Sequence, residues 1–115
     1  MKLLSWNVNG IRARYNNNHI QQVFDQSPDI ICLQEVKANP EQIPSQLLEL
    51  DDYHFYLNHN KSNSYTGVGI FTKEEPINIE RGFENLEEGR VLKQNLMNSH
   101  CTIFIFQMVQ DQQKN

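Results

Sequence analysis

The stretch MKLLSWNVNG, residues 1–10, is the part of the sequence that decides the fold. Lys2 to Trp6 predicts a strand, and Asn7 falls at its C-terminal end, where the pattern turns polar. Gly10 permits a sharp exit that a Cβ would obstruct. Since α/β proteins commonly bind ligands outside the carboxyl ends of their strands, we expect Asn7 to face a ligand site.

A second strand of the same kind is predicted at Asp29–Glu35, apolar until it ends in an amide and a carboxylate. Between the two strands, His19–Gln26 has apolar residues at helical spacing and predicts a short helix. Strand, helix and strand in this order predict a right-handed parallel crossover. The crossover would bring Asn7 and Glu35 to one edge of a sheet, where their oxygens suit a hard divalent cation.

The remaining chain predicts further short elements without a repeat, a linker or a second domain. Gly67 and Gly69 within one strand suggest close approach by another backbone or a ligand. The expected elements are a loop at Ile11–Asn18, a helix within Pro40–Leu50 with its ordered start near Ile43 or Pro44, strands at Tyr53–Leu57, Gly67–Thr72, Pro76–Arg81, Arg90–Leu96 and Cys101–Phe106, and a loop at Asn58–Thr66.

Composition is that of a small protein without a membrane span or a leading signal segment. The 115 residues carry a formal net charge of -4, which argues against coating nucleic acid by charge alone. It does not exclude an enzyme that holds a phosphate through a metal and local cations such as Arg12 and Arg14. Cys32 and Cys101 both lie in apolar runs, which favours buried thiols in a reducing cytoplasm.

Four blocks of sequence carry a resemblance to a known family. They are LLSWNVNGIRA (3–13), PDIICLQEVKA (28–38), YTGVGIFTKEEP (65–76) and EGRVL (88–92). In order and spacing they resemble the N-terminal half of exodeoxyribonuclease III-type enzymes, the bacterial apurinic/apyrimidinic endonucleases of the endonuclease/exonuclease/phosphatase superfamily. The resemblance covers roughly residues 2–93. It implies a four-layer αββα sandwich and Mg²⁺- or Mn²⁺-dependent cleavage of DNA, 5′ to abasic sites and from 3′ ends.

The resemblance also implies roles for individual residues. Asn7 matches the active-site asparagine that orients the metal site and the phosphate, and Glu35 matches the metal-binding glutamate; both are the expected catalytic and metal residues. Asn9 stands where some relatives carry an aspartate. Lys37 matches a lysine close to the metal-binding carboxylate. The positions implied to lie near DNA are Arg12, Lys37 and Tyr65.

The chemistry needs these residue types for a physical reason. Phosphodiester cleavage builds negative charge at phosphorus, which a cation held by a carboxylate neutralises. An asparagine exchanges hydrogen bonds there without adding charge that would repel the phosphate.

The chain departs from the family pattern after EGRVL. The family's catalytic tyrosine and following proline have no match in Thr102–Val109, where Phe106 or Gln107 occupies the tyrosine's place. The family's "GDxN" aspartate and asparagine and its late histidine have no counterpart either. We therefore expect residues 1–106 to form the N-terminal half of the domain and 107–115 a divergent, disordered tail.

The expected fold is an incomplete, deoxyribonuclease I-like αββα sandwich with about one sheet and two flanking helices. Exposing on the order of ten apolar side chains would forfeit about 1.5–3 kcal/mol each. This loss predicts marginal folding, self-association through the bare sheet, or degradation.

Three functions remain open from the sequence. The first is a DNA-repair nuclease by descent, truncated and inactive alone. The second is a non-catalytic metal- and DNA-binding half-domain, or a non-functional fragment. The third is a relative that acts on RNA, inositol phosphates or lipids, although the "NGIRA" and "LQEVKA" blocks favour the DNA-repair branch.

Overall fold

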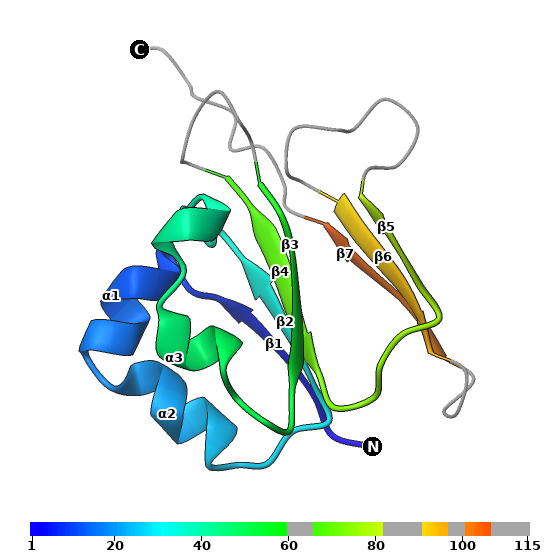
Figure 1. Ribbon diagram of the computed structural model, residues 1–115, viewed down its shortest axis with the longest axis horizontal. Helices are drawn as coiled ribbons and strands as arrows, with labels where there is room; N and C mark the ends of the chain where they lie inside the picture. The colour runs from blue at the N-terminus through cyan, green and yellow to red at the C-terminus, as the bar shows by residue number, and fades with distance from the viewer. Residues whose placement is uncertain (60–65, 82–90, 97–100, 107–115) are drawn as a thin grey trace, which may run out of the picture.

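The computed structural model describes residues 1–59, 66–81, 91–96 and 101–106. Figure 1 shows three layers: a group of short helices, a sheet against which they pack, and a second sheet on the far side of the first. Tyr65 and the tail 107–115 lie outside the described residues, so the predictions made for them stay predictions.

The first sheet has four strands in the order β1-β2-β4-β3. The predicted parallel arrangement of the first two strands is confirmed, because β1 and β2 are adjacent and parallel, with Asn7 paired with Gln34. The other two strands run antiparallel to them, which makes the sheet mixed. The strands are β1 (Leu3–Asn7), β2 (Ile30–Gln34), β3 (His54–Asn58) and β4 (Val68–Thr72).

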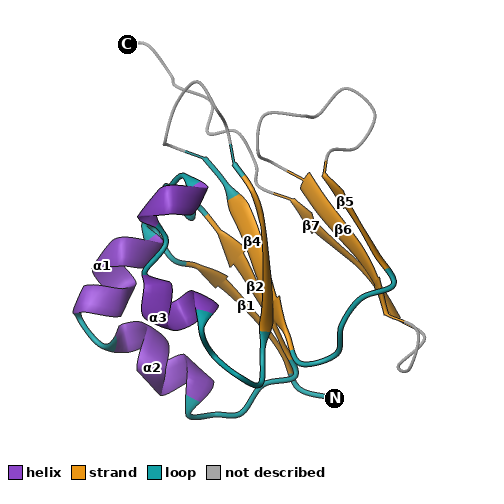
Figure 2. Ribbon diagram, in the orientation of Figure 1, coloured by secondary structure: helices purple, strands orange, loops and turns teal. Residues whose placement is uncertain are grey.

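Short helices cover one face of this sheet (Figure 2). They are α1 (Ile11–Asn16), α2 (His19–Phe24), the 3-10 turn η1 (Pro40–Gln42) and α3 (Ser45–Leu48). The loop predicted at 11–18 is therefore wrong, since most of it is α1. Ile11 and Tyr15, four residues apart, both pack in the hydrophobic core between the helices and the first sheet, which explains why a polar segment forms a helix here.

The second predicted helix is interrupted rather than continuous. Ile43 is extended, with φ -70° and ψ 129°, as expected of a residue before proline. Pro44 then immediately precedes α3, so the ordered helix starts after the proline, close to the expected position.

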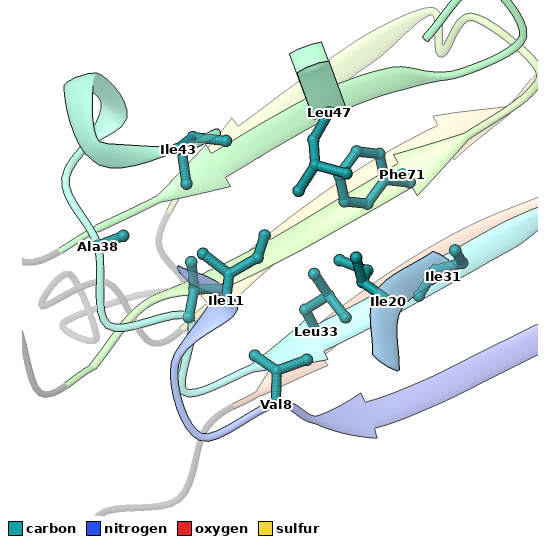
Figure 3. Packing of buried hydrophobic residues seen from close by; sticks show 10 residues of the cluster. Val8, Ile11, Ile20, Ile31, Leu33, Ala38, Ile43, Leu47 and Phe71 are labelled. Carbon is teal, nitrogen blue, oxygen red and sulfur yellow. The ribbon is translucent and has the colours of Figure 1, made fainter. Parts of the chain in front are cut away.

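The helix-side core lies between the helices and the first sheet. Phe71 is fully buried and meets Phe24 and Phe55 at ring-centroid distances of 5.0 and 4.4 Å. Figure 3 shows side chains from the helices, from β2 and β4, and from the loops that follow β1 and β2 converging on this layer. Its buried members are Val8, Ile11, Ile20, Ile31, Leu33, Val36, Ala38, Ile43, Leu47 and Phe71. This core fixes the chain immediately beyond β1 and β2, where the predicted site lies.

The second sheet corrects the expectation of one sheet with a bare inner face. It has three antiparallel strands, β5 (Asn78–Arg81), β6 (Val91–Leu96) and β7 (Cys101–Phe106), in the order β5-β6-β7. The inter-sheet core joins it to the first sheet through Ile30, Cys32, Val68, Ile70, Leu92, Leu96, Ile103 and Ile105. Because alternate residues of both sheets point into this layer, the inner face is buried rather than exposed.

Candidate metal and phosphate site at the ends of β1 and β2

The ends of β1 and β2 bring the two predicted key side chains into contact. Asn7 closes β1, and Glu35 follows directly after β2. The Nδ2 of Asn7 donates a hydrogen bond of 2.6 Å to Oε2 of Glu35. The predicted proximity is therefore confirmed, and the parallel pairing of the two strands is its cause.

The backbone holds the two loops beyond the strands together. Val8 N donates to Gln34 O at 3.0 Å, and Gly10 N donates to Glu35 O at 2.9 Å. The next amide along, that of Ile11, donates to Val36 O at 3.0 Å. This continuous row of hydrogen bonds fixes the Asn7 loop against the Glu35 loop before any ligand binds.

A third segment closes the site from the β4 side. Val36 N donates to Gly67 O at 2.9 Å, and Lys37 N donates to Thr66 O at 3.3 Å. Gly67 has φ +129°, and a Cβ there would lie 3.5 Å from Val36 Cβ and 3.7 Å from Lys37 N. These would be ordinary contacts, so the positive φ, rather than the close approach predicted from the sequence, explains the glycine at this position. The Gly67 carbonyl supports the loop that carries Glu35.

Three residues of the site have left-handed backbones. Asn9, Glu35 and Lys37 have φ values of 47°, 52° and 53°. Asparagine tolerates this region, but glutamate and lysine adopt it at a cost. Strained backbone conformations of this kind cluster at functional sites, where the surrounding structure holds a side chain in the position that the chemistry requires.

Lys37 lies inside the site, beside the carboxylate. Its Nζ donates to Asn9 Oδ1 at 2.6 Å and lies 3.5 Å from Oε1 of Glu35. Sequence reasoning placed Lys37 near the carboxylate but missed its bond to Asn9, which depends on two coordinated left-handed turns. Arg12 lies at the exposed rim and donates from Nη2 to the Lys37 carbonyl at 3.0 Å.

Asn7 is oriented as a positioning group. Its Oδ1 accepts from the Asn9 amide at 3.1 Å while its Nδ2 faces Glu35. The Glu35 side chain is 25% exposed, so the carboxylate remains reachable from solvent. Asn7 thus fixes the direction of a carboxylate that an incoming cation can approach.

The oxygen donors of this site fit Mg²⁺ or Mn²⁺ better than they fit a metal ion that takes all of its ligands from the protein. Within the described ranges no group of three His, Cys, Asp or Glu side chains is placed to hold a metal. One carboxylate with neighbouring amide oxygens fits Mg²⁺, which keeps several waters and takes further oxygens from a substrate phosphate. Glu35 would hold the ion, with Asn7 and Asn9 beside it.

The described residues include three histidines. His19 Nδ1 is 3.5 Å from Arg14 Nη1 at the start of α2, His54 is exposed on β3, and His59 directly follows β3. None of the three takes part in the hydrogen bonds of Asn7 and Glu35 given above. None of the described helices has the length and apolar character needed to cross a membrane.

Comparison with known proteins identifies the family of the chain. The chain belongs to the Endonuclease/Exonuclease/phosphatase family, whose sequence profile matches residues 4–103. Among curated relatives, an exodeoxyribonuclease of Bacillus subtilis is 40% identical over 96 residues, covering 80% of this chain and 37% of the relative. DNA repair nuclease APEX1 of Danio rerio is 35% identical over 97 residues, covering 80% of this chain and 31% of its own length.

Solved structures place the fold in the same class. A 3′ phosphatase, NExo, from Neisseria, bound to a product DNA hairpin, superposes with a TM-score of 0.76 at 25% identity and covers 90% of this chain. An AP endonuclease from Archaeoglobus fulgidus superposes with a TM-score of 0.68 at 29% identity over 84% of this chain. The predicted deoxyribonuclease I-like fold is confirmed. The chain spans 40% and 37% of these two structures, and about a third of the curated relatives named above.

Proposed function

We propose that this chain supplies the metal-binding half of a Mg²⁺- or Mn²⁺-dependent DNA phosphodiesterase of base-excision repair, acting at abasic sites and 3′ ends. The observation that carries the proposal is the 2.6 Å hydrogen bond from Asn7 to Glu35 at the ends of two parallel strands. The names of the relatives support DNA as the substrate class, since they include an exodeoxyribonuclease and a DNA repair nuclease.

Each residue of the site has a distinct task in this reaction. When bound, the divalent cation supplies positive charge against the charge that builds at phosphorus. Glu35 holds that ion, and Asn7 keeps the Glu35 carboxylate oriented toward it without adding negative charge near the phosphate. The guanidinium of Arg12, exposed at the rim, would contact the DNA backbone.

The 115 residues contain no counterpart of the family's tyrosine, "GDxN" pair or late histidine. General acid–base groups of that kind typically contribute 10²–10⁴-fold to a rate, so hydrolysis by residues 1–115 without them should be slow. We expect these residues alone to bind metal and DNA without completing hydrolysis. A non-catalytic binding half-domain is therefore the closest alternative, and a non-functional fragment is the outcome if no binding occurs.

The test is metal-dependent retention of a duplex carrying an abasic-site analogue, run beside a nicking assay on the same duplex. We expect Mg²⁺ to increase retention by the parent chain and Glu35→Gln to remove the increase, with no nicking by either. Glu49→Gln, an exposed carboxylate that follows α3, is the matched control and should behave as the parent does. Retention that ignores both Mg²⁺ and Glu35 would remove the basis of the proposal.

We place the chain in the cytoplasm. Cys32 is a buried thiol in β2, which agrees with a reducing compartment. Mass spectrometry of the protein purified without reductant, after alkylation of the unfolded chain, should find Cys32 alkylated rather than in a disulfide.

We propose that the chain associates with itself through an aromatic pair on β7. The inner face of the first sheet is covered, but Phe104 and Phe106 on β7 are 43% and 46% exposed and stack at 6.1 Å. Exposed aromatic pairs on a sheet favour association with another copy. Sedimentation of the parent should show a concentration-dependent dimer that Phe104→Ser removes; a parent that stays monomeric at high concentration would exclude it.

A further inference from the structure

The ammonium of Lys37 lies beside the Glu35 carboxylate, next to the oxygen that does not accept from Asn7. Its Nζ lies 3.5 Å from Glu35 Oε1, while Oε2 is engaged by Asn7. The Lys37 side chain is 32% exposed, so it has room to swing toward solvent. The carboxylate that should bind the cation is thus paired with a cation of the protein itself.

Asn9 makes this pairing a property of the present sequence. Lys37 Nζ donates to Asn9 Oδ1 at 2.6 Å, but an amide oxygen carries no net charge with which to neutralise the ammonium. An aspartate at the same position would give Lys37 a second carboxylate partner. With asparagine there, neutralisation of the ammonium within this cluster falls to Glu35.

We propose that Lys37 is an internal counter-ion that a divalent cation must displace from Glu35, and that this displacement couples metal binding to phosphate binding. A displaced ammonium in a half-exposed site is stabilised by an anion, and a DNA phosphate supplies one. Metal and DNA should therefore each increase the affinity for the other by the same factor. The inference rests on the proposed function, since it takes Glu35 as the metal ligand.

The test is Mn²⁺ affinity, followed by electron paramagnetic resonance of free Mn²⁺, with and without a duplex that carries an abasic-site analogue. In the parent, we expect DNA to tighten Mn²⁺ binding about five-fold, the size that a half-exposed ion pair supports. Lys37→Met should bind Mn²⁺ about five-fold more tightly without DNA, and DNA should tighten its Mn²⁺ binding by a smaller factor than in the parent.

Lys73→Met is the matched control, because it removes the same charge from another lysine. Lys73 follows β4, and its backbone amide bonds to Asp29, which precedes β2 at the opposite end from Glu35. If Lys73→Met raises Mn²⁺ affinity as much as Lys37→Met does, the effect is one of net charge and the proposal fails.

Asn9→Asp is a second variant that keeps the backbone, since aspartate tolerates the left-handed conformation as asparagine does. It should tighten Mn²⁺ binding more in the parent than in Lys37→Met, because only the parent has an ammonium to draw away from Glu35. Equal gains in the two backgrounds would overturn the proposal.

The two possible failures are distinguishable. If Glu35→Gln leaves Mn²⁺ binding unchanged, the metal does not bind at Glu35 and the proposed function itself fails. If Glu35→Gln abolishes binding while Lys37→Met changes nothing, the metal site stands and only the counter-ion role of Lys37 is wrong.

Discussion

Glu35 and Lys37 illustrate how single residues are held against their own conformational preference. Both have a left-handed backbone, which costs about 1–3 kcal/mol for residues of this kind. The hydrogen bonds of Gly10 and Val36 hold the turn from either side. Stability is thereby exchanged for a fixed carboxylate, which is the arrangement that metal and phosphate binding require.

A buried amide in the inter-sheet core gives a prediction at the same scale. Gln94 on β6 has no exposed surface, and neither its Oε1 nor its Nε2 finds a hydrogen-bond partner among the described residues. An unsatisfied buried polar group costs about 1–3 kcal/mol, so Gln94→Met should raise the free energy of unfolding by about that amount. Urea denaturation checks it, and a less stable variant would show that the amide is satisfied in solution.

Asp29 gives a prediction for acid stability. A backbone hydrogen bond of 2.7 Å from Lys2, with Lys73 and the amino terminus nearby, lowers the pKa of its carboxyl from the usual 3.8. A lowered folded-state pKa stabilises the fold at pH above the unfolded value, and that contribution is lost as the pH falls through the folded value.

Asp29→Asn should therefore lower stability at neutral pH and flatten its fall in acid below the usual pKa of 3.8. Thermal melts from pH 7 down to about pH 2 measure both effects. Asp51→Asn, at an exposed turn, is the control. An acid profile of Asp29→Asn that runs parallel to the parent's would contradict the assigned role.

At the scale of elements, β1 and β2 could be read from the sequence because their signals are local. Each is an apolar run that ends in polar residues, and the helix between them predicts a parallel pair. The proximity of Asn7 to Glu35 follows from that pairing alone. The link between Lys37 and Asn9 did not follow, because it depends on positive φ at non-glycine residues, which propensity argues against.

Helix α1 shows the opposite limit of sequence reasoning. Its segment is rich in arginine and asparagine, and only Ile11 and Tyr15 mark its buried face. Contact with the helix-side core forms the helix where intrinsic propensity would not. The second sheet was not predicted for a related reason. Each of its strands could be predicted singly, but the sequence of one strand does not indicate which strands it pairs with or which sheet it packs against.

Gly67 provides the test at this scale. Its φ of +129° lies where side chains are rarely found, and its carbonyl accepts from Val36 in the loop that carries Glu35. Gly67→Ala should lower stability by about 1–3 kcal/mol and weaken Mn²⁺ binding through the displaced loop.

Gly69→Ala separates these two effects. A Cβ at Gly69 meets the Phe55 ring at 3.0 Å, on the helix-side face of the sheet. It should lower stability and leave Mn²⁺ affinity unchanged. If both variants weaken metal binding equally, Gly67 has no particular role in the site.

At the scale of the whole molecule, two cores share the first sheet. Phe71 and Leu33 point to the helices, while Ile70 and Cys32 point to the second sheet. Because the same strands line both cores, the three layers should unfold together. The apolar side chains on the inner face of the first sheet were expected to be exposed, but the second sheet covers them.

Leu92→Ala tests this coupling. Leu92 on β6 is fully buried between the sheets, so its truncation should cost about 2–5 kcal/mol. Leu47→Ala on α3, in the helix-side core, is the comparison. Far-ultraviolet circular dichroism and Trp6 fluorescence should report one common transition for each variant. Separate transitions for Leu92→Ala would show that the second sheet is an independent unit.

The most direct measurement of the central claim is nuclear magnetic resonance of the amide groups during titration with substoichiometric Mn²⁺. If Asn7 and Glu35 form the metal site, paramagnetic broadening should begin at Asn7, Asn9, Glu35 and Lys37 and should vanish in Glu35→Gln. Broadening that begins instead around Asp29 and Lys73, or that persists unchanged in Glu35→Gln, would contradict the account.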